Sequence, residues 1–180
     1  MPCCKEKDND LGGDDFSTGK VSFKKFGMQV YFPENKWGNQ DSTRNEPGYE
    51  REGIFTFLKE SGGVINNQTY YSVHISFWRF ISSFEDESEA NKKVGEIKEI
   101  YDYWMSVGEN YSSVGSITSS QISNYPALKI ESETKNNSIE KSYFVYHGKR
   151  LYWIAVVMPK NSMYSAECEE IINTLEITDN

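Results

Sequence analysis

The sequence predicts a single α+β domain in which helices pack on an antiparallel sheet. Strand-like segments precede a long amphipathic helix and follow it, and a second helix-like segment closes the chain. The connections between the strands are short, which favours antiparallel pairing. The length of 180 residues fits one domain with a single core.

Residues 1–20 are expected to form a flexible acidic tail or tether. They carry many charged side chains, two adjacent glycines and almost nothing apolar. Such a segment cannot bury enough surface to offset the entropy that ordering costs. The folded domain is therefore expected to span residues 21–180.

The first half of the domain is predicted to hold three strands. The first is Phe26 to Phe32, ended by Pro33, and a long polar loop follows it from Glu34 to Arg51. The second strand is Gly53 to Lys59. The third is Tyr70 to Phe80, where apolar side chains alternate between two faces that are both partly covered.

The clearest helix is predicted from Glu85 to Val107. Asp86 with Glu89 three residues later resembles a capping box, and Gly108 ends the helix. One apolar stripe, which must lie on the sheet, recurs at spacings of four and three residues. Its members are Ala90, Val94, Ile97, Tyr101 and Trp104.

The second half is predicted to be a group of strands and a closing helix. A weak, serine-rich strand covers residues 113–122, and strands follow at 127–133, 139–147 and 151–158. Gly148-Lys149 is interpreted as a two-residue hairpin loop of the Gly-X kind. The closing helix, Tyr164 to Leu175, places Tyr164, Cys168, Ile171 and Leu175 on one stripe.

Three segments resemble the PsbP-like (Mog/PsbP) superfamily, close to its small DcrB-like bacterial members. They are Met28-Gln29-Val30-Tyr31-Phe32-Pro33-Glu34, then Tyr125-Pro126-Ala127-Leu128, and the block Gly148-Lys149-Arg150-Leu151-Tyr152-Trp153 with Pro159 and Cys168 to Ile177 after it. The resemblance implies a three-layer α/β/α sandwich with an antiparallel sheet. It also implies a non-enzymatic accessory or binding role, and it assigns no binding residue to this chain.

Charge and hydropathy argue against two classes of partner. The net charge is −8 and lysines alternate with glutamates, whereas phosphate contacts need clustered Lys and Arg. No run approaches the roughly 20 apolar residues that span a bilayer. We therefore expect no nucleic-acid binding, and contact with a membrane only through a lipid anchor.

The sequence predicts no enzymatic site. His74 and His147 are the two histidines, and neither stands in a recognisable nucleophile, phosphate-binding or zinc motif. Residues 8–14 resemble the opening of a calcium loop, but Gly19 stands where the bidentate glutamate is needed. The acidic cluster Glu85, Asp86, Glu87 and Glu89 fits charges that complement a helix dipole. We expect no catalytic residue, no metal and no cofactor.

Trp37 and Tyr49 are the candidate contact residues for a partner. Both fall in the predicted polar loop, where functional residues are common. The alternative is that these rings anchor the loop to the domain. The expected partner is a protein or peptide, or a small apolar ligand, bound without chemistry.

Cys3 and Cys4 leave two hypotheses open. A cysteine pair before a charged tail is typical of a lipid-anchored cell-envelope protein, with Cys3 or Cys4 lipidated after a leader has been removed. Met1-Pro2 supplies no such leader in the chain as it stands. The alternative is a soluble intracellular adaptor or chaperone in the cytoplasm, with two exposed thiols. An enzyme is the least favoured class.

Overall fold

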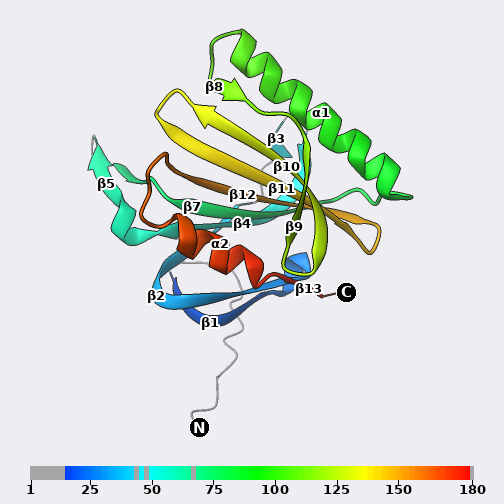
Figure 1. The fold of residues 1–180 in the computed structure, drawn as a ribbon. Coiled ribbons are helices and arrows are strands. Elements are labelled where there is room, and N and C mark those ends of the chain that lie inside the picture. Colours follow the sequence, from blue (N-terminus) through cyan, green and yellow to red (C-terminus); the bar gives the residue numbers. More distant parts are fainter. Residues whose placement is uncertain (1–14, 43–44, 47–48, 66–67, 179–180) are drawn as a thin grey trace.

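A long, strongly twisted antiparallel sheet runs through the whole molecule (Figure 1). The computed structural model describes residues 15–42, 45–46, 49–65 and 68–178. The strands are β1 (Asp15–Phe23), β2 (Met28–Ser42), β3 (Asn45–Glu46), β4 (Tyr49–Leu58), β5 (Gly62–Ile65), β6 (Gln68–Tyr71), β7 (His74–Phe80), β8 (Tyr111–Val114), β9 (Thr118–Ile122), β10 (Tyr125–Thr134), β11 (Ser138–His147), β12 (Arg150–Pro159) and β13 (Glu176–Ile177).

The main sheet has the order β1-β2-β4-β7-β12-β11-β10-β8. Three short strands join it at the sides: β13 pairs with β2, β3 with β4, and β9 with β10. Strands β5 and β6 form a separate two-stranded ribbon. The helices are α1 (Glu87–Ser106) and α2 (Ser165–Asn173), with single 3-10 turns at Lys24–Phe26 and Lys59–Ser61.

The two helices cover opposite faces of the sheet, which gives the three-layer α/β/α sandwich. Alternate residues of β12 enter different cores: Ile154 and Val156 belong to the core under α2, and Trp153 and Ala155 to the core under α1. This alternation follows from the two-residue period of a strand. The α+β class and the layer order expected from the sequence are confirmed.

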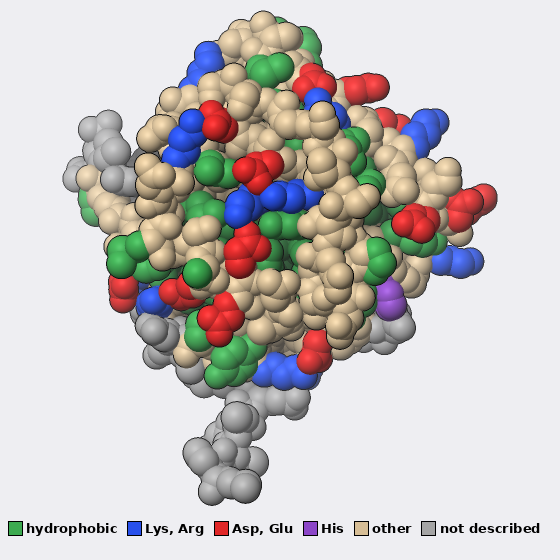
Figure 2. All heavy atoms as spheres, in the orientation of Figure 1, with side chains coloured by type: hydrophobic (Ala, Val, Ile, Leu, Met, Phe, Trp, Pro, Cys, Tyr) green, Lys and Arg blue, Asp and Glu red, His purple; other side chains and the backbone are tan. Residues whose placement is uncertain are grey.

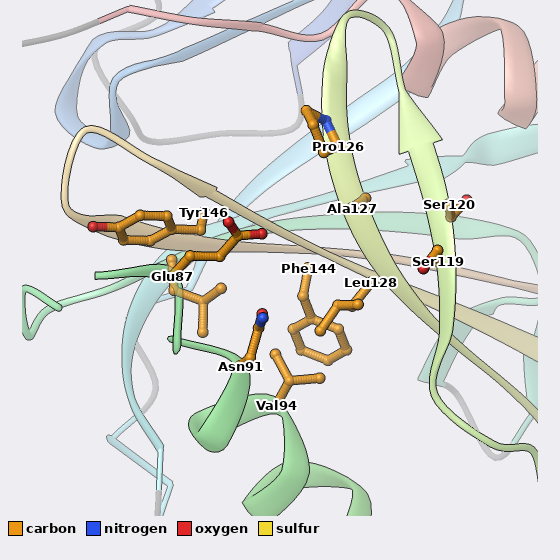
Figure 3. Close-up of a pocket in the computed structure, with 11 residues that line it drawn as sticks. Glu87, Asn91, Val94, Ser119, Ser120, Pro126, Ala127, Leu128, Phe144 and Tyr146 are labelled. Atoms are coloured by element: carbon orange, nitrogen blue, oxygen red, sulfur yellow. The ribbon is translucent and has the colours of Figure 1, made fainter. Parts of the chain in front are cut away.

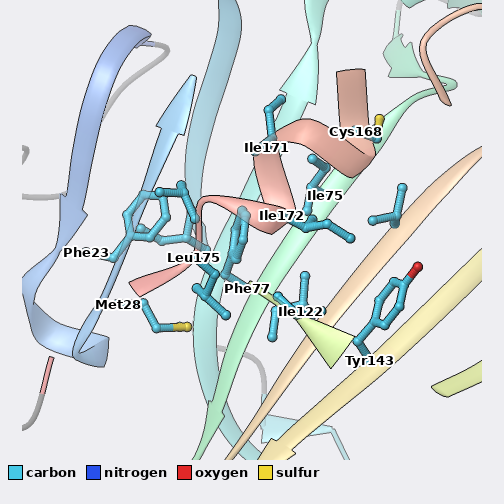
Figure 4. Close-up of a cluster of buried hydrophobic side chains, with 14 of the residues drawn as sticks. Phe23, Met28, Ile75, Phe77, Ile122, Tyr143, Cys168, Ile171, Ile172 and Leu175 are labelled. Atoms are coloured by element: carbon cyan, nitrogen blue, oxygen red, sulfur yellow. The ribbon is translucent and has the colours of Figure 1, made fainter. Parts of the chain in front are cut away.

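The core under α2 is the larger one, and the closing helix supplies part of it. In Figure 4 Cys168, Ile171 and Ile172 of α2 lie over the β7 side chains Ile75 and Phe77. All five are buried. Cys168 and Ile171 belong to the stripe predicted for the closing helix, so the stripe is confirmed at these two residues.

The long helix begins and ends as its sequence predicts. The Asp86 side chain caps it by accepting a hydrogen bond from the Glu89 amide at 2.9 Å. The Glu89 carboxylate in turn accepts one from the Glu85 amide at 2.6 Å. Of the predicted stripe, Ala90, Val94, Ile97 and Tyr101 are buried and Trp104 is half-buried.

Two sequence expectations near the N-terminus are wrong. The tail was expected to reach Lys20, but β1 begins at Asp15 and pairs with β2 from Asp15 opposite Asn39 onward. Residues 15–20 thus belong to the sheet, and residues 1–14 lie outside the described part. The predicted polar loop from Glu34 to Arg51 is largely strand, because β2 continues to Ser42 and β4 starts at Tyr49.

Pro33 does not end the strand, for a reason visible in the register. The β1–β2 pairing shifts between Ser17, opposite Trp37, and Gly19, opposite Phe32. Pro33 follows Phe32 within this irregularity, where the missing N–H costs no regular ladder bond. The strand then continues and exchanges its neighbour, pairing with β4 from Trp37 to Ser42.

Three smaller differences concern turns and breaks. The predicted third strand is divided into β6 and β7 at residues 72–73. The weak strand at 113–122 is two short strands, β8 and β9, separated by residues 115–117. Gly148 and Lys149 both have positive φ, 56° and 61°, so the hairpin turn is of the I′ kind and not the predicted Gly-X kind.

Candidate functional site

A pocket of about 230 Å³ opens between the N-terminal half of α1 and strands β9 and β10 (Figure 3). We call it the α1–β10 pocket. It forms because α1 packs on β8, β10 and β11, while the β9–β10 hairpin extends beyond the helix. Its lining residues are Glu87, Asn91, Val94, Ser119, Ser120, Pro126, Ala127, Leu128, Phe144, Tyr146 and Leu151.

The floor of the pocket is apolar and fixed by the core. Val94, Phe144 and Leu151 are buried and belong to the core under α1. Leu128 of β10 is half-buried and points toward Phe144 in Figure 3. Such a floor favours an apolar group and holds its shape without the group, because each floor residue packs on the sheet.

The rim of the pocket is polar and nearly uncharged. Asn91 of α1 and Ser119 of β9 are exposed there, and Tyr146 is half-buried. Glu87, in the first turn of α1, is the one charged side chain among the lining residues. The opening therefore offers several hydrogen-bonding groups and a single negative charge.

A buried polar network fixes the helix beside the pocket. The Tyr101 hydroxyl donates to Glu140 at 2.6 Å, and the Tyr111 hydroxyl donates to the other carboxylate oxygen at 2.9 Å. The Trp153 indole donates to Ser142 at 3.0 Å, and Ser142 donates to Glu140 at 3.0 Å. Burial, with Glu140 nearby, raises the pKa of Tyr101 well above its ordinary value. The tyrosine therefore stays neutral and continues to donate.

The two histidines and Cys168 lie away from this pocket. Burial lowers the pKa of His74 to about 4, and its ring packs 4.6 Å from the Phe55 ring. His147 packs edge-on against Tyr125 at 5.3 Å. Burial also raises the pKa of the Cys168 thiol to about 12. None of these three is a lining residue, and the polar groups at the pocket are those of its rim.

Among the residues that the structure describes, no group of three or more His, Cys, Asp or Glu is placed to hold a metal ion. Within those residues, no helix combines the length and the apolar character needed to cross a membrane.

Trp37, a predicted contact residue, is a core residue. It is 0% exposed, and its indole donates to the Glu167 carboxylate of α2 at 2.9 Å. Lys36 completes this link with an ion pair to Glu167 at 2.9 Å. The anchoring alternative fits this burial, because Trp37 joins β2 to α2 and exposes no surface to a partner.

The other predicted site residues lie outside what the structure describes. Tyr49 begins strand β4, but its side chain is not among the described ones. Cys3 and Cys4 precede the first described residue. Lipidation at either cysteine and partner contact at Tyr49 thus stay predictions.

Sequence reasoning missed the α1–β10 pocket. Its residues come from α1, β9, β10, β11 and β12, and no motif joins them along the chain. One signal was present: Pro126, Ala127 and Leu128 form a conspicuous segment, which the sequence analysis assigned only to the fold.

Comparisons with known proteins show the fold alone. No family model and no curated protein matches this sequence. The solution structure of cyanobacterial PsbP (CyanoP) from Synechocystis aligns with a TM-score of 0.57 at 8% identity, covering 96% of this chain and 98% of that one. A crystal structure from Bacteroides thetaiotaomicron aligns with a TM-score of 0.55 at 13% identity, covering 91% of this chain. This chain covers 49% of the Bacteroides chain, about half its length. The chain thus has a PsbP-like fold, as the resemblance implied.

Proposed function

We propose that this chain is a non-enzymatic accessory protein that binds a protein partner through the α1–β10 pocket. The observation that carries the proposal is the make-up of that pocket: an apolar floor, a hydroxyl and amide rim, and one carboxylate. This combination recognises an apolar group flanked by polar backbone. The PsbP-like fold supports an accessory role as well.

The size of the pocket favours a partner's side chain over a free small molecule. Pockets that enclose a drug-sized ligand measure about 300–1,000 Å³. The α1–β10 pocket, at about 230 Å³, is smaller and open to one side. It suits one large apolar side chain presented by a polypeptide that also contacts the rim.

The surface charge supports a partner that is neutral or basic. The chain carries a net charge of −8, and like charges slow encounter. On the face shown in Figure 2, lysines and acidic residues are interspersed, and no basic patch gathers there. The net negative charge of the chain would slow the approach of an acidic partner or a nucleic acid.

Capture of a partner tests the pocket. Leu128→Glu places a charge on the floor, and Asn91→Arg blocks the exposed rim without touching the core. Both should weaken capture of the partner from the native envelope or soluble fraction by roughly tenfold or more. Met163→Glu is the matched control, because Met163 is 85% exposed and does not line the pocket. Full-strength capture by both pocket variants would remove the pocket from the proposal.

We also propose that the protein is anchored in the cell envelope by a lipid on Cys3 or Cys4. Support comes from the adjacent cysteines and from the charged residues that separate them from β1. Production from the native gene with a clickable fatty acid should label the wild type and not the Cys3→Ser, Cys4→Ser double variant. An unlabelled, fully soluble wild type would favour the alternative, a cytoplasmic adaptor.

A further inference from the structure

We infer that the partner at the α1–β10 pocket is an extended peptide segment that adds as a strand to the free edge of β9. The inference rests on the proposed function and names the form of the partner. It joins three observations: the outward hydrogen-bonding groups of β9, the absence of charge along that strand, and the pocket beside it.

Strand β9 has one open edge. Among the described strands it pairs with β10 alone, in the register Tyr125–Ile122 to Lys129–Thr118. Thr118, Ser119 and Gln121 are exposed. The other long side of β9 therefore faces no described strand.

The register shows which backbone groups point outward. Pro126 lies opposite Gln121 and has no N–H, so this pair cannot be a hydrogen-bonded pair of the ladder. Hydrogen-bonded and non-hydrogen-bonded pairs alternate in an antiparallel ladder. The next bonded pair is thus Ala127 with Ser120, which leaves the N–H and C=O of Ser119 and Gln121 directed away from β10. The Glu131 carbonyl agrees with this phase, because it accepts from the Gly115 amide on the same side of β10.

The edge of β9 lacks the usual protection against strand addition. Exposed edges are commonly blunted by lysine, proline or a bulge. The irregular residues 115–117 interrupt the edge before β9, and a Cβ at Gly115 would lie 2.6 Å from the Glu131 carbonyl. From Thr118 to Ile122 the sequence is Thr-Ser-Ser-Gln-Ile, with neither charge nor proline. This stretch is open to pairing.

The pocket lies where an added strand would place a side chain. Neighbouring strands are about 4.8 Å apart, and alternate side chains share a face. Ser119 lies opposite Leu128, so these two side chains share the face of the sheet that α1 covers, and both residues line the pocket. An apolar side chain of the added strand on that face can therefore pass over the small Ser119 side chain toward Leu128. Glu87 at the rim favours Lys or Arg at a neighbouring position of the peptide.

Selection from a displayed library of random short linear peptides, using the full chain as bait, tests the inference. We expect enriched peptides with alternating character, one large apolar residue and a nearby Lys or Arg. N-methylation along an enriched peptide should abolish binding at every second residue, because only alternate N–H groups of an edge strand bond to its neighbour. No enrichment, or uniform sensitivity to N-methylation, would overturn the inference.

Two variants at one position separate backbone from side chain. Ser119→Pro removes the outward N–H of β9 and leaves the β10 ladder intact, since edge strands accept proline where the N–H faces solvent. It should weaken peptide binding by roughly tenfold or more. Ser119→Ala keeps the N–H and removes only a rim hydroxyl, so it should weaken peptide binding much less than Ser119→Pro does. Thermal melts of both should match the wild type within about 2 °C.

The outcomes distinguish the inference from the proposed function. If Leu128→Glu abolishes binding and Ser119→Pro does not, the pocket binds the partner and strand addition is wrong. If neither variant weakens binding, both ideas fail. If the wild type forms a concentration-dependent dimer that Ser119→Pro abolishes, the occupant is a second copy of the chain, and the peptide assignment is overturned.

Discussion

At the scale of single residues, two glycines leave space that neighbouring aromatic rings occupy. A Cβ at Gly53 would approach the Phe77 carbonyl to 2.2 Å and the Trp78 ring to 2.6 Å, and one at Gly38 would meet the Phe57 ring at 2.4 Å. Arg51 then stacks over Trp78, with 4.3 Å from its guanidinium carbon to the ring centroid. The glycines are thus required by close packing, since neither has a positive φ.

Gly53→Ala should destabilise the domain by about 1–3 kcal/mol, because the added methyl overpacks the β4–β7 contact. Urea denaturation measures this change. Gly95→Ala on α1 is the matched control: nothing lies within 4 Å of its Cβ position, and alanine should stabilise the helix by about 0.5–1 kcal/mol. Equal effects of the two substitutions would contradict the packing argument.

His74 makes stability depend on pH. Burial lowers its pKa from 6.5 to about 4, and a backbone hydrogen bond at Tyr71 offsets only part of this shift. Between these two values the unfolded chain binds a proton that the folded chain does not. Stability therefore falls as the pH drops from about 6.5 to about 4.

The contribution of His74 is isolated by comparing how the stability of wild type and of His74→Gln depends on pH. Thermal melts across that pH range should show a smaller loss of stability for His74→Gln, because glutamine does not titrate. His147→Gln serves as the control and should lose stability as the wild type does. Parallel pH profiles for wild type and His74→Gln would show that His74 does not contribute.

At the scale of elements, β1 and α2 complete the layer on one face. Val21 and Phe23 of β1 enter the core under α2, together with Ile171 and Leu175. Lys20 at the middle of β1 forms an ion pair with Glu176 of β13 at 3.0 Å. Both ends of the described chain are therefore joined at the same edge of the sheet.

Two truncated proteins test separately whether residues 1–14 and the first residues of β1 contribute to stability. A protein starting at Asp15 should melt within about 2 °C of the full chain, whereas one starting at Val21 should melt at least about 4 °C lower. The second truncation removes the residues that pair from Asp15 opposite Asn39 to Lys20 opposite Tyr31. Equal melting of the two truncated proteins would restore the domain boundary at residue 21.

At the scale of the whole molecule, two cores share one sheet. Strands β7 and β12 supply side chains to both cores, with Phe77 and Ile154 on one face and Trp78 and Trp153 on the other. Loss of either core would expose the backbone of these two central strands. The domain is thus one cooperative unit, with both helices dependent on the central strands.

Substitutions in either core should therefore lower one shared transition. Ile171→Ala under α2 and Val94→Ala under α1 are expected to cost about 2–5 and about 1–3 kcal/mol. Differential scanning calorimetry should show a single peak for each, with equal calorimetric and van't Hoff enthalpies. A second, lower transition in one variant alone would show that the cores melt independently.

The sequence by itself determined the elements whose signals are local. Helix α1 was predicted within a few residues because its cap, from Asp86 to Glu89, and its stripe depend on neighbours in the chain. The α+β class followed from the order of these elements. The α1–β10 pocket could not be predicted, because it joins residues from five elements that only the sheet order brings together.

Tertiary structure decided the cases in which local signals were misleading. Pro33 and the polar residues after it predicted a loop, but pairing with β1 and β4 extends β2 to Ser42. Trp37 looked like an exposed contact because its neighbours are polar, yet Glu167, far along the chain, accepts its indole N–H inside the fold. Propensity registers only nearby residues, whereas burial and sheet pairing depend on partners that the chain brings together from a distance.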